Sequence, residues 1–375
     1  MSRHLCFAAL ALCLVALPQT HALAQSGGIP KSAKESGNVQ QSAGEIRAFV
    51  SEQITRLQDS TASEQHAARS ALVEEIMVDG HPAQTSFLAA YCAEFAGQAR
   101  PLFQSENMAV RLNAAIILAK LAERSQTQQL LEPTLAVLND SADPVVLWGL
   151  KSAKAILPVV LGAPGLPKAS ELIPKVVDVA VRRQSGYVVQ DAYDALTLDF
   201  LTNPKPISNP MLVTVTPAML QVLNARAGKY KTVIPDEPMS ENLATLFLTD
   251  GKVWSAQPAD QQVAIVQSLL NLASSASQRI ASATPGNQRN MVVRASQSTA
   301  KGLGVIGNRL GDKAWETAAQ QVSQIIEATP AEEVKTRLSA LATAIKANSK
   351  FAVVEEPVSL PALQSPTPAS TTPAR

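Results

Sequence analysis

Apolar positions between about residues 45 and 351 repeat with the spacing of amphipathic helices. Short runs of Gly, Pro, Asn and Asp separate one helical segment from the next, as in DGHP (79–82), NDSADP (139–144) and ATPGN (283–287). The run MLVTVT, residues 211–216, fits either a strand or a β-branched entrance to a helix before Pro217. Because no alternation of strands and helices accompanies it, the pattern predicts an all-α protein.

Three helical segments carry a proline in the same register. LLEPTLAVLND, ELIPKVVDVAV and TVTPAMLQVLN contain Pro133, Pro174 and Pro217, which are 41 and 43 residues apart. A period in the forties is typical of stacked helical hairpins. Apolar residues follow each proline by two and by five positions, so one helix face is repeated: Leu135 and Leu138, Val176 and Val179, Met219 and Val222.

A second apolar helix follows the first two of these segments, and a similar helix, MAVRLNAAIILAKL, precedes the set. The second helices are DPVVLWGLKSAKAIL and GYVVQDAYDALTLDF, and Asp140 and Asp143 are expected to cap the first of them near Pro144. Small residues at matched positions predict close approach of neighbouring helices, and large ones fill the space between them. The matched pairs are Val110 and Val145, Ala114 and Gly149, Leu118 and Ala153, and Leu121 and Ile156.

Residues from about 105 to 200 resemble HEAT repeats. LLEPTLAVLNDSADPVVLWGLKSAKAIL combines a proline-bearing first helix, an Asn-Asp turn and a Val-led second helix, and Val110-Arg111 stands at the family's Val-Arg position. Val146 and Val189 stand where the family has the Arg that makes a polar contact between repeats. The resemblance implies a right-handed superhelical α-solenoid of about six hairpins, whose second helices line a concave face used for protein contacts.

The two ends of the chain differ from this central region. Residues 1–24 combine a basic start, an apolar run and an A-x-A site, which predicts a secretory signal peptide. Residues 25–44 are polar and rich in Gly and Ser and predict a disordered leader, whereas residues 352–375 are rich in Pro, Ser and Thr and predict a disordered tail that acts as a tether or spacer. No later stretch reaches about 18 uninterrupted apolar residues, so we expect an exported protein, periplasmic, extracellular or envelope-associated, without a transmembrane segment.

Candidate catalytic and metal-binding residues are few. Without residues 1–24 the chain keeps one cysteine, Cys92, and two histidines, His66 and His81, and its 31 basic residues balance 31 acidic ones. Cys92 lies in an apolar helical context and is interpreted as a core residue. No Walker, C-x-x-C or H-E-x-x-H motif is present. We therefore predict no enzymatic activity, no cofactor, no metal and no binding of nucleic acid.

KGLGVIGNRLG matches the dinucleotide-binding pattern G-x-G-x-x-G at Gly302, Gly304 and Gly307. The residues before it are too polar for a buried strand, and no βαβ unit surrounds it. A single helix from about Asn290 to Leu310 explains more positions, and its glycines would let another helix pack closely. The predicted core face is Val292, Ala295, Thr299, Leu303, Ile306 and Leu310, and the predicted small-residue row is Ala300, Gly304, Gly307 and Gly311.

Charge is uneven along the chain. Residues 287–313 carry a local charge of +4, and residues 235–262 carry −4. Either these adjacent hairpins neutralise each other, or Arg294, Lys301 and Arg309 form a basic strip that binds a protein partner. The leading hypothesis is a non-enzymatic scaffold or adaptor for protein–protein interaction. The alternatives are a helical ligand-binding protein or enzyme with a site built from scattered Arg, Asp and Ser side chains, and an envelope component that self-associates through the ends of its hairpin array.

Overall fold

The computed structural model describes residues 28–35, 39–59, 61–163, 169–198, 200–201, 207–227, 236–326 and 331–357. Helices make up almost all of the regular structure of these residues, so the predicted all-α class is confirmed. One short antiparallel hairpin joins β1 (Met77–Val78) to β2 (His81–Pro82). The predicted signal peptide, residues 1–24, lies outside the described residues.

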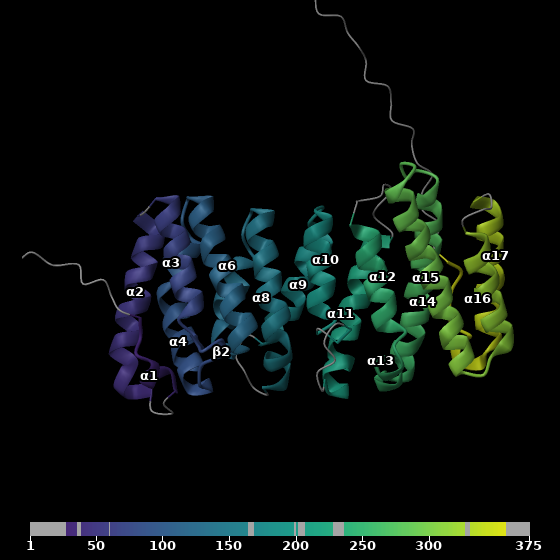
Figure 1. The fold of residues 1–375 in the computed structure, drawn as a ribbon. Helices are drawn as coiled ribbons and strands as arrows, with labels where there is room; N and C mark the ends of the chain where they lie inside the picture. The colour runs from purple at the N-terminus through teal and green to yellow at the C-terminus, as the bar shows by residue number, and fades with distance from the viewer. Residues whose placement is uncertain are drawn as a thin grey trace, which may run out of the picture.

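The longer helices lie in two layers, and Figure 1 shows them side by side in chain order. The first layer contains α2 (Ala43–Asp59), α4 (Thr85–Gln98), α7 (Leu131–Val137), α9 (Ala169–Arg182), α11 (Asn209–Ala227), α14 (Ala259–Ile280) and α17 (Ala331–Ala347). The second layer contains α3 (Ala62–Glu74), α6 (Met108–Ser125), α8 (Asp143–Gly162), α10 (Gly186–Leu196), α12 (Glu237–Leu248), α15 (Asn287–Arg309) and α16 (Lys313–Ile325). The short helices are α1 (Lys31–Glu35), η1 (Val39–Ser42), α5 (Arg100–Phe103), η2 (Gln128–Leu130), α13 (Gly251–Ala256) and η3 (Ser349–Phe351).

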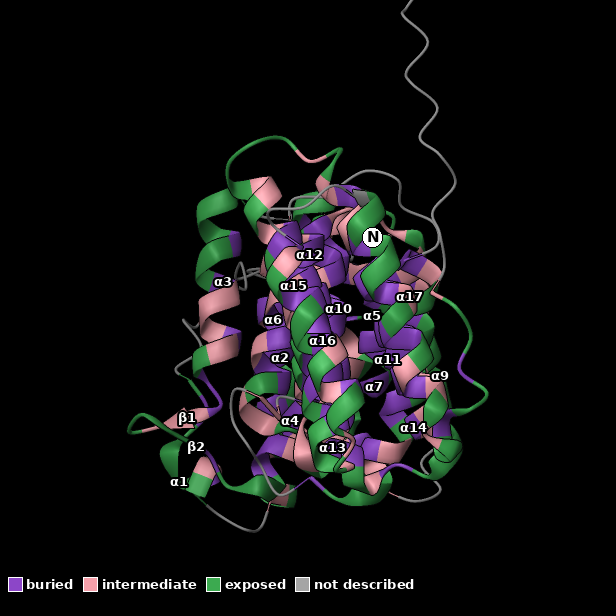
Figure 2. Ribbon diagram, turned by 90° about the vertical axis from the view of Figure 1, so that its right-hand side faces the viewer, coloured by how far each residue is buried: buried purple, intermediate pink, exposed green. Residues whose placement is uncertain are grey.

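The hydrophobic core lies between the two layers. Each long helix contacts its neighbours in its own layer and a helix of the other layer, with α5 and η2 bridging α4 and α7. Figure 2 views the row from its end and shows the buried residues gathered between the layers, with exposed residues on the outer faces. One continuous cluster of buried apolar residues runs from Ile29 to Val354. A pair of helices cannot cover its own apolar face, so neighbouring pairs share this core.

The repeated prolines and the matched small residues lie where the sequence predicts. Pro133, Pro174 and Pro217 are in α7, α9 and α11, which are successive helices of the first layer. The matched pairs of the second helices are all buried. A Cβ atom on Gly149 would lie 2.8 Å from Cγ1 of Val137, so glycine is required for α8 to approach α7 this closely.

The segment 211–216 is helical. It forms part of α11, and the hydroxyl groups of Thr214 and Thr216 donate to the carbonyl oxygens of Pro210 and Leu212, at 2.8 Å each. Hydrogen bonds to the preceding turn satisfy these hydroxyls inside the helix. The helical interpretation of this run is therefore confirmed.

The glycine-rich stretch lies within one continuous helix, α15, which begins at Asn287 and ends at Arg309. The predicted core face is buried except for the half-buried Leu310. A Cβ atom on Gly302 would lie 2.8 Å from Cγ2 of Thr249, and one on Gly307 would lie 2.9 Å from Cγ of Trp315. The glycines thus allow α15 to pack closely against its neighbours, and this stretch lacks the strand–turn–helix geometry of a dinucleotide site.

The structure differs from the prediction at both ends of the domain. Residues 28–35 and 39–44, predicted as part of a disordered leader, are folded: Ile29 is 4% exposed, and its N–H donates to the Glu75 carboxylate at 2.6 Å. Lys34 forms an ion pair with the same carboxylate at 2.6 Å. The polar composition of residues 28–35 does not reveal this contact, because its partner, Glu75, lies 46 residues away in the sequence. At the other end Val354 is buried, so the domain extends beyond residue 351, and residues 358–375 of the predicted tail lie outside the described residues.

Among the described helices, α8 alone is long and apolar enough to cross a membrane by length and composition. Half of its apolar window is buried, and the helix packs against α6, α7 and α10. Its outer face carries Lys151 and Lys154. An apolar face toward the core and a charged face outward are typical of a core helix in a folded domain. The absence of a transmembrane segment stays a prediction.

Candidate partner-binding surface

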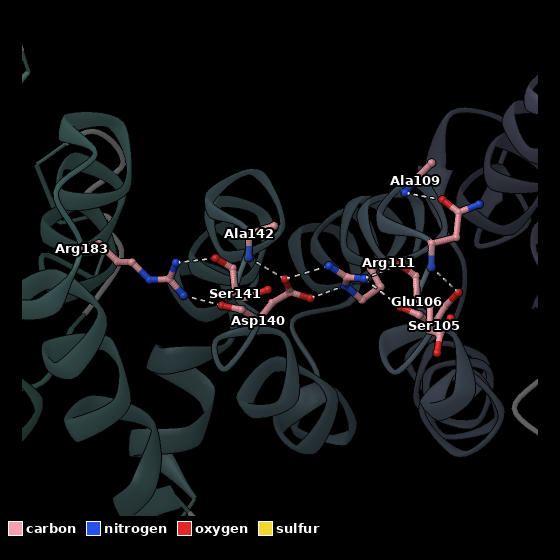
Figure 3. Close-up of polar contacts among 9 residues, drawn as sticks. Ser105, Glu106, Ala109, Arg111, Asp140, Ser141, Ala142 and Arg183 are labelled. Carbon is pink, nitrogen blue, oxygen red and sulfur yellow. Dashed lines mark hydrogen bonds and ion pairs between the residues drawn. The ribbon is translucent and has the colours of Figure 1, made fainter.

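Arg111 connects two successive turns of the chain (Figure 3). Its Nε donates to Oδ2 of Asp140 at 2.7 Å, and its Nη1 donates to the carbonyl oxygen of Ser105 at 2.8 Å. The other oxygen of Asp140 accepts the N–H of Ala142 at 2.8 Å. Ala142 is the N-cap residue of α8 and provides no side-chain cap, so the expectation that Asp140 and Asp143 cap this helix is wrong. Asp140 instead stabilises its own turn and holds Arg111.

Two further arginines make polar contacts between successive helices. The resemblance to HEAT repeats places such an arginine at positions 146 and 189, which are valine in this chain. Arg183, which follows α9, donates to the carbonyl oxygens of Asp140 and Ser141, the latter at 2.8 Å (Figure 3). Arg226, near the end of α11, donates to the carbonyl oxygens of Ala180 at 2.7 Å and Arg183 at 3.2 Å. We did not predict these arginines, although the sequence carries a signal for them, since each follows the proline of its helix by nine residues. They hold neighbouring first-layer helices together and are occupied by that role.

A buried ionic cluster lies between α11, α12 and α14. Nη2 of Arg279 lies 2.5 Å from the Glu241 carboxylate, and Nη1 lies 3.3 Å from the Glu237 carboxylate. Nε of Arg226 lies 3.4 Å from the same oxygen of Glu237. All four side chains are almost fully inaccessible to solvent, and their formal charges sum to zero. The charges of these four residues are thus paired with one another inside the protein.

The environment of Glu237 perturbs its titration. Burial first, and then the neighbouring carboxylate of Glu241, raise the pKa of Glu237 to about 7, although Arg279 and Arg226 act in the opposite direction. Burial also raises the pKa of Tyr193, whose ring lies on α10 beside the cluster, well above its ordinary value. Both shifts follow from placing ionisable groups where water cannot solvate their charged forms.

The acidic segment 235–262 is largely committed to other partners. Glu237 and Glu241 pair with Arg226 and Arg279. Asp250 accepts the backbone N–H groups of Lys252 and Val253, at 2.8 and 3.3 Å, and thereby caps α13. The hypothesis that the two charged segments neutralise each other is therefore wrong for these carboxylates. The basic charge on α15 is not balanced by them.

The three predicted basic residues differ in their surroundings. All three are exposed on α15. Within the described part of the chain, Arg294 and Lys301 make no hydrogen bond or ion pair, whereas Nη1 of Arg309 donates to the carbonyl oxygen of Thr249 at 2.6 Å. Arg294 and Lys301 are seven residues apart, about 10 Å along one helix face. The structure thus leaves two of the three predicted cations available to a partner, and it uses the third to hold α15 against the end of α12.

Exposed apolar side chains lie beside these cations. Val305 is on α15, and Met239 and Leu246 are seven residues apart on the neighbouring α12. Lys301 and Val305 also line a groove of about 370 Å³ between α15 and α16. Glu316, which pairs with Lys313, lines the same groove. Exposed apolar residues next to unpaired charges are typical of a protein-interaction surface. The sequence reveals the charges but not the apolar residues, because their exposure depends on the packing of α12.

Two aromatic residues of the second layer were not predicted either. Trp148 on α8 is half-buried and lines a groove of about 350 Å³ between α6 and α8, and Tyr187 on α10 is 68% exposed. Every other described Trp and Tyr is buried. Among the described Trp and Tyr residues, the two that reach the surface therefore lie on neighbouring helices of one layer.

The residues considered for catalysis are not brought together. Cys92 is fully buried, and burial raises the pKa of its thiol to about 11. His81 is exposed in β2. Among the described residues no three His, Cys, Asp or Glu side chains are grouped so that they could hold a metal ion. Cys92 is thus a core residue, as the sequence predicts.

Comparison with known proteins adds no assignment. No family model matches this chain, and a search of the curated proteins finds no similar sequence.

Proposed function

We propose that this protein is an exported, non-enzymatic scaffold built as a HEAT-like α-solenoid, and that it binds an acidic segment of a partner protein on the second layer. The two layers of successive helices support the solenoid, because each helix contacts its sequence neighbours and shares one core with them. The binding surface comprises α12 and α15, with Arg294 and Lys301 as its main cations.

One observation carries the proposal. Arg294 and Lys301 are exposed and without partners in the described part of the chain, while Glu237 and Glu241, which could have neutralised them, are paired in the buried cluster. Unpaired surface cations next to exposed apolar side chains attract an acidic partner and give its binding a dependence on salt.

Affinity capture with residues 25–375 from the native envelope extract tests this proposal. The test variant is Arg294→Glu with Lys301→Glu; Arg309 is left unchanged because it holds the Thr249 carbonyl. The control variant is Arg100→Glu with Lys335→Glu, which changes the charge equally at two exposed positions of the domain outside the second layer. We expect a partner that the wild type and the control capture at low salt, and that the test variant loses. Retention of every captured protein by the test variant would contradict the proposal.

A further inference from the structure

Two contacts set the register between α12 and α15, which pack side by side (Figure 1). The hydroxyl groups of Thr245 and Thr299 are 3.3 Å apart. One turn farther along both helices, Cγ2 of Thr249 lies 2.8 Å from the position of a Cβ atom on Gly302. The helices therefore run in the same direction, and each residue of α12 is level with the residue of α15 that follows it by 53 or 54 positions.

This register places the exposed residues of the two helices in two pairs. Met239 is level with residues 292 and 293, next to Arg294, and Leu246 is level with residues 299 and 300, next to Lys301. All four side chains are exposed. On each helix the two residues are seven positions apart, which is about 10.5 Å along the axis. We call these four residues the α12–α15 surface; it repeats one apolar side chain beside one cation.

The α12–α15 surface points away from the first layer, whose helix α14 contacts both α12 and α15. On α15 the Ser296 hydroxyl donates to the carbonyl oxygen of Ala273 in α14 at 3.3 Å. On α12 the Glu241 carboxylate lies 2.5 Å from Nη2 of Arg279 in α14. On each helix the residues of the surface stand two positions before and five positions after that buried residue, about 140–160° around the helix from it. The four exposed side chains therefore lie on one outer face.

The charge of this face is positive. Helix α15 has 23 residues, of which four are basic and none is acidic. Both carboxylates of α12, Glu237 and Glu241, are buried with arginines of the core. Asp236 and Asp250 flank α12 at its two ends, outside the span of the surface, and Asp250 caps α13. A partner that carries carboxylates is therefore complementary in charge to this face.

The repeat of the α12–α15 surface favours a helical ligand. A helix that lies along α12 and α15 repeats its side chains every two turns, at the same interval of about 10.5 Å. It can present a stripe of apolar residues with acidic residues along one border, and so meet both pairs at once. A β-strand repeats its face about every 6.6 Å, so it meets one pair and not the other.

We infer that the α12–α15 surface binds an acidic amphipathic helix of a partner protein. Apolar residues of that helix, seven positions apart, contact Met239 and Leu246, and carboxylates with the same spacing pair with Arg294 and Lys301. This inference rests on the proposed function, since it names the conformation and the residue pattern of the acidic segment that the second layer binds.

A labelled peptide of eighteen residues tests the inference by fluorescence anisotropy with the chain 25–375. Leucines stand at positions 4, 8, 11 and 15, which form one stripe of a helix, and glutamates stand at positions 7 and 14 along one border of that stripe. Alanine and glutamine at the other positions favour a helix without adding charge. We expect saturable binding that weakens as the salt concentration rises. Absence of saturable binding at low salt would overturn the inference.

Variants of the chain locate the bound peptide. We expect Arg294→Glu and Lys301→Glu each to weaken binding at least tenfold, and Met239→Ala and Leu246→Ala each to weaken it at least fivefold. Met108→Ala is the matched control, because Met108 is 49% exposed and Met239 is 46% exposed, and Met108 lies on α6 of the same layer. Its affinity should stay within twofold of the wild type. Equal effects of the two methionine substitutions would overturn the assignment to α12 and α15.

Peptide controls separate charge from conformation. Lysine in place of both glutamates should lower the affinity at least tenfold. Proline at position 9 interrupts the helix and should abolish binding. A hydrocarbon staple between positions 6 and 10, on the face opposite to the leucines, should tighten binding because the helix is then formed in advance. Binding of the proline peptide as tightly as the parent peptide would overturn the helical assignment.

The two proposals fail in different ways. Loss of the captured partner in the Arg294 and Lys301 variant, together with capture and peptide binding that Met239→Ala and Leu246→Ala leave unchanged, would overturn the helical ligand and leave the scaffold function intact. Capture that is insensitive to the two charge reversals would remove the proposed function itself. Far-ultraviolet circular dichroism of each variant confirms that the changes at these surface positions leave the helical fold intact.

Discussion

Glu237 shows how the fold changes the chemistry of a single side chain. It is an acidic residue at the start of α12, where a carboxylate would ordinarily face solvent. Here the helix end is buried against Arg226 and Arg279, and Glu241 lies one turn along the same helix. The cost of burying two carboxylates together outweighs the attraction of the arginines, so Glu237 holds its proton at pH values at which a free glutamate has lost it.

This shift in the pKa of Glu237 predicts how stability depends on pH. Because the pKa is about 7 in the folded chain and near 4.5 in the unfolded chain, only the folded chain binds this proton between those values. The free energy of unfolding should therefore fall as pH rises from 5 to 7, by up to about 1.4 kcal/mol per pH unit from this group. Urea unfolding at several pH values measures the slope.

Glu237→Gln should remove that slope, because the amide does not titrate. Glu332→Gln, at an exposed position of α17, serves as the control and should retain the slope of the wild type. A slope that is equal in the wild type and in Glu237→Gln would show that another group is responsible.

At the scale of the elements, polar contacts hold the C-terminal end of α9 against the turn that follows α7. Arg183 donates to two backbone carbonyl groups in the turn between α7 and α8, and to the carboxylate of Asp143 at the start of α8, at 2.9 Å. Its neighbour Arg182 is exposed, and in the part of the chain that the structure describes its ion pair is with Asp178 of the same helix, at 2.5 Å. These adjacent arginines have equal charge, but Arg183 is partly buried and connects two elements, whereas Arg182 is exposed and contacts its own helix.

Arg183→Ala should lower the free energy of unfolding by about 2 kcal/mol, because the change leaves partly buried carbonyl oxygens without their charged donor. Arg182→Ala should change it by less than about 0.5 kcal/mol, as expected for an exposed ion pair within one helix. Urea denaturation of the two variants measures the difference. Equal effects of the two substitutions would contradict the structural role of Arg183.

Across the array as a whole, each part depends on its neighbours, and Phe351 completes the core near the C-terminal end. The Phe351 ring is fully buried. It packs edge-on to Trp315 of α16 with ring centroids 5.1 Å apart, and it stacks on Trp254 of α13 at 6.4 Å. A residue after the last long helix therefore covers two elements that precede it by about 36 and 97 residues.

Phe351→Ala should destabilise the C-terminal part of the array by about 3–5 kcal/mol through the cavity that it leaves. Because contacts in a stacked array are mainly between neighbours, we expect Trp254 and Trp315 fluorescence to change at a lower urea concentration than the far-ultraviolet circular dichroism of the whole chain. Val353→Ala, at a position that is 75% exposed, should change neither transition. Coincident transitions in Phe351→Ala would show instead that the array unfolds as one unit.

Predictions from the sequence were most accurate where the cause is local. Helix α15 and its buried face follow from the spacing of residues such as Val292 and Leu303, and the buried position of Cys92 follows from its apolar neighbours. The segment 28–35 was predicted incorrectly, because its buried apolar anchor, Ile29, depends on a carboxylate 46 residues away. The recurrence of Arg nine positions after Pro174 and Pro217 was present in the sequence, but its meaning required the contacts of Arg183 and Arg226.

Spacing within single helices was enough to establish the all-α class, the register of the prolines and the packing role of the glycines in α15. Which charges are paired and which are free depends instead on how the helices pack. Glu237 and Glu241 lie on α12, which contacts α15, yet they pair with Arg226 and Arg279 in the core. Contacts between helices likewise join residues 40 and 54 positions apart, as in the Lys151–Asp191 ion pair and the contact of the Thr245 and Thr299 hydroxyl groups. Such offsets are set by the packing of whole elements, which no local pattern encodes.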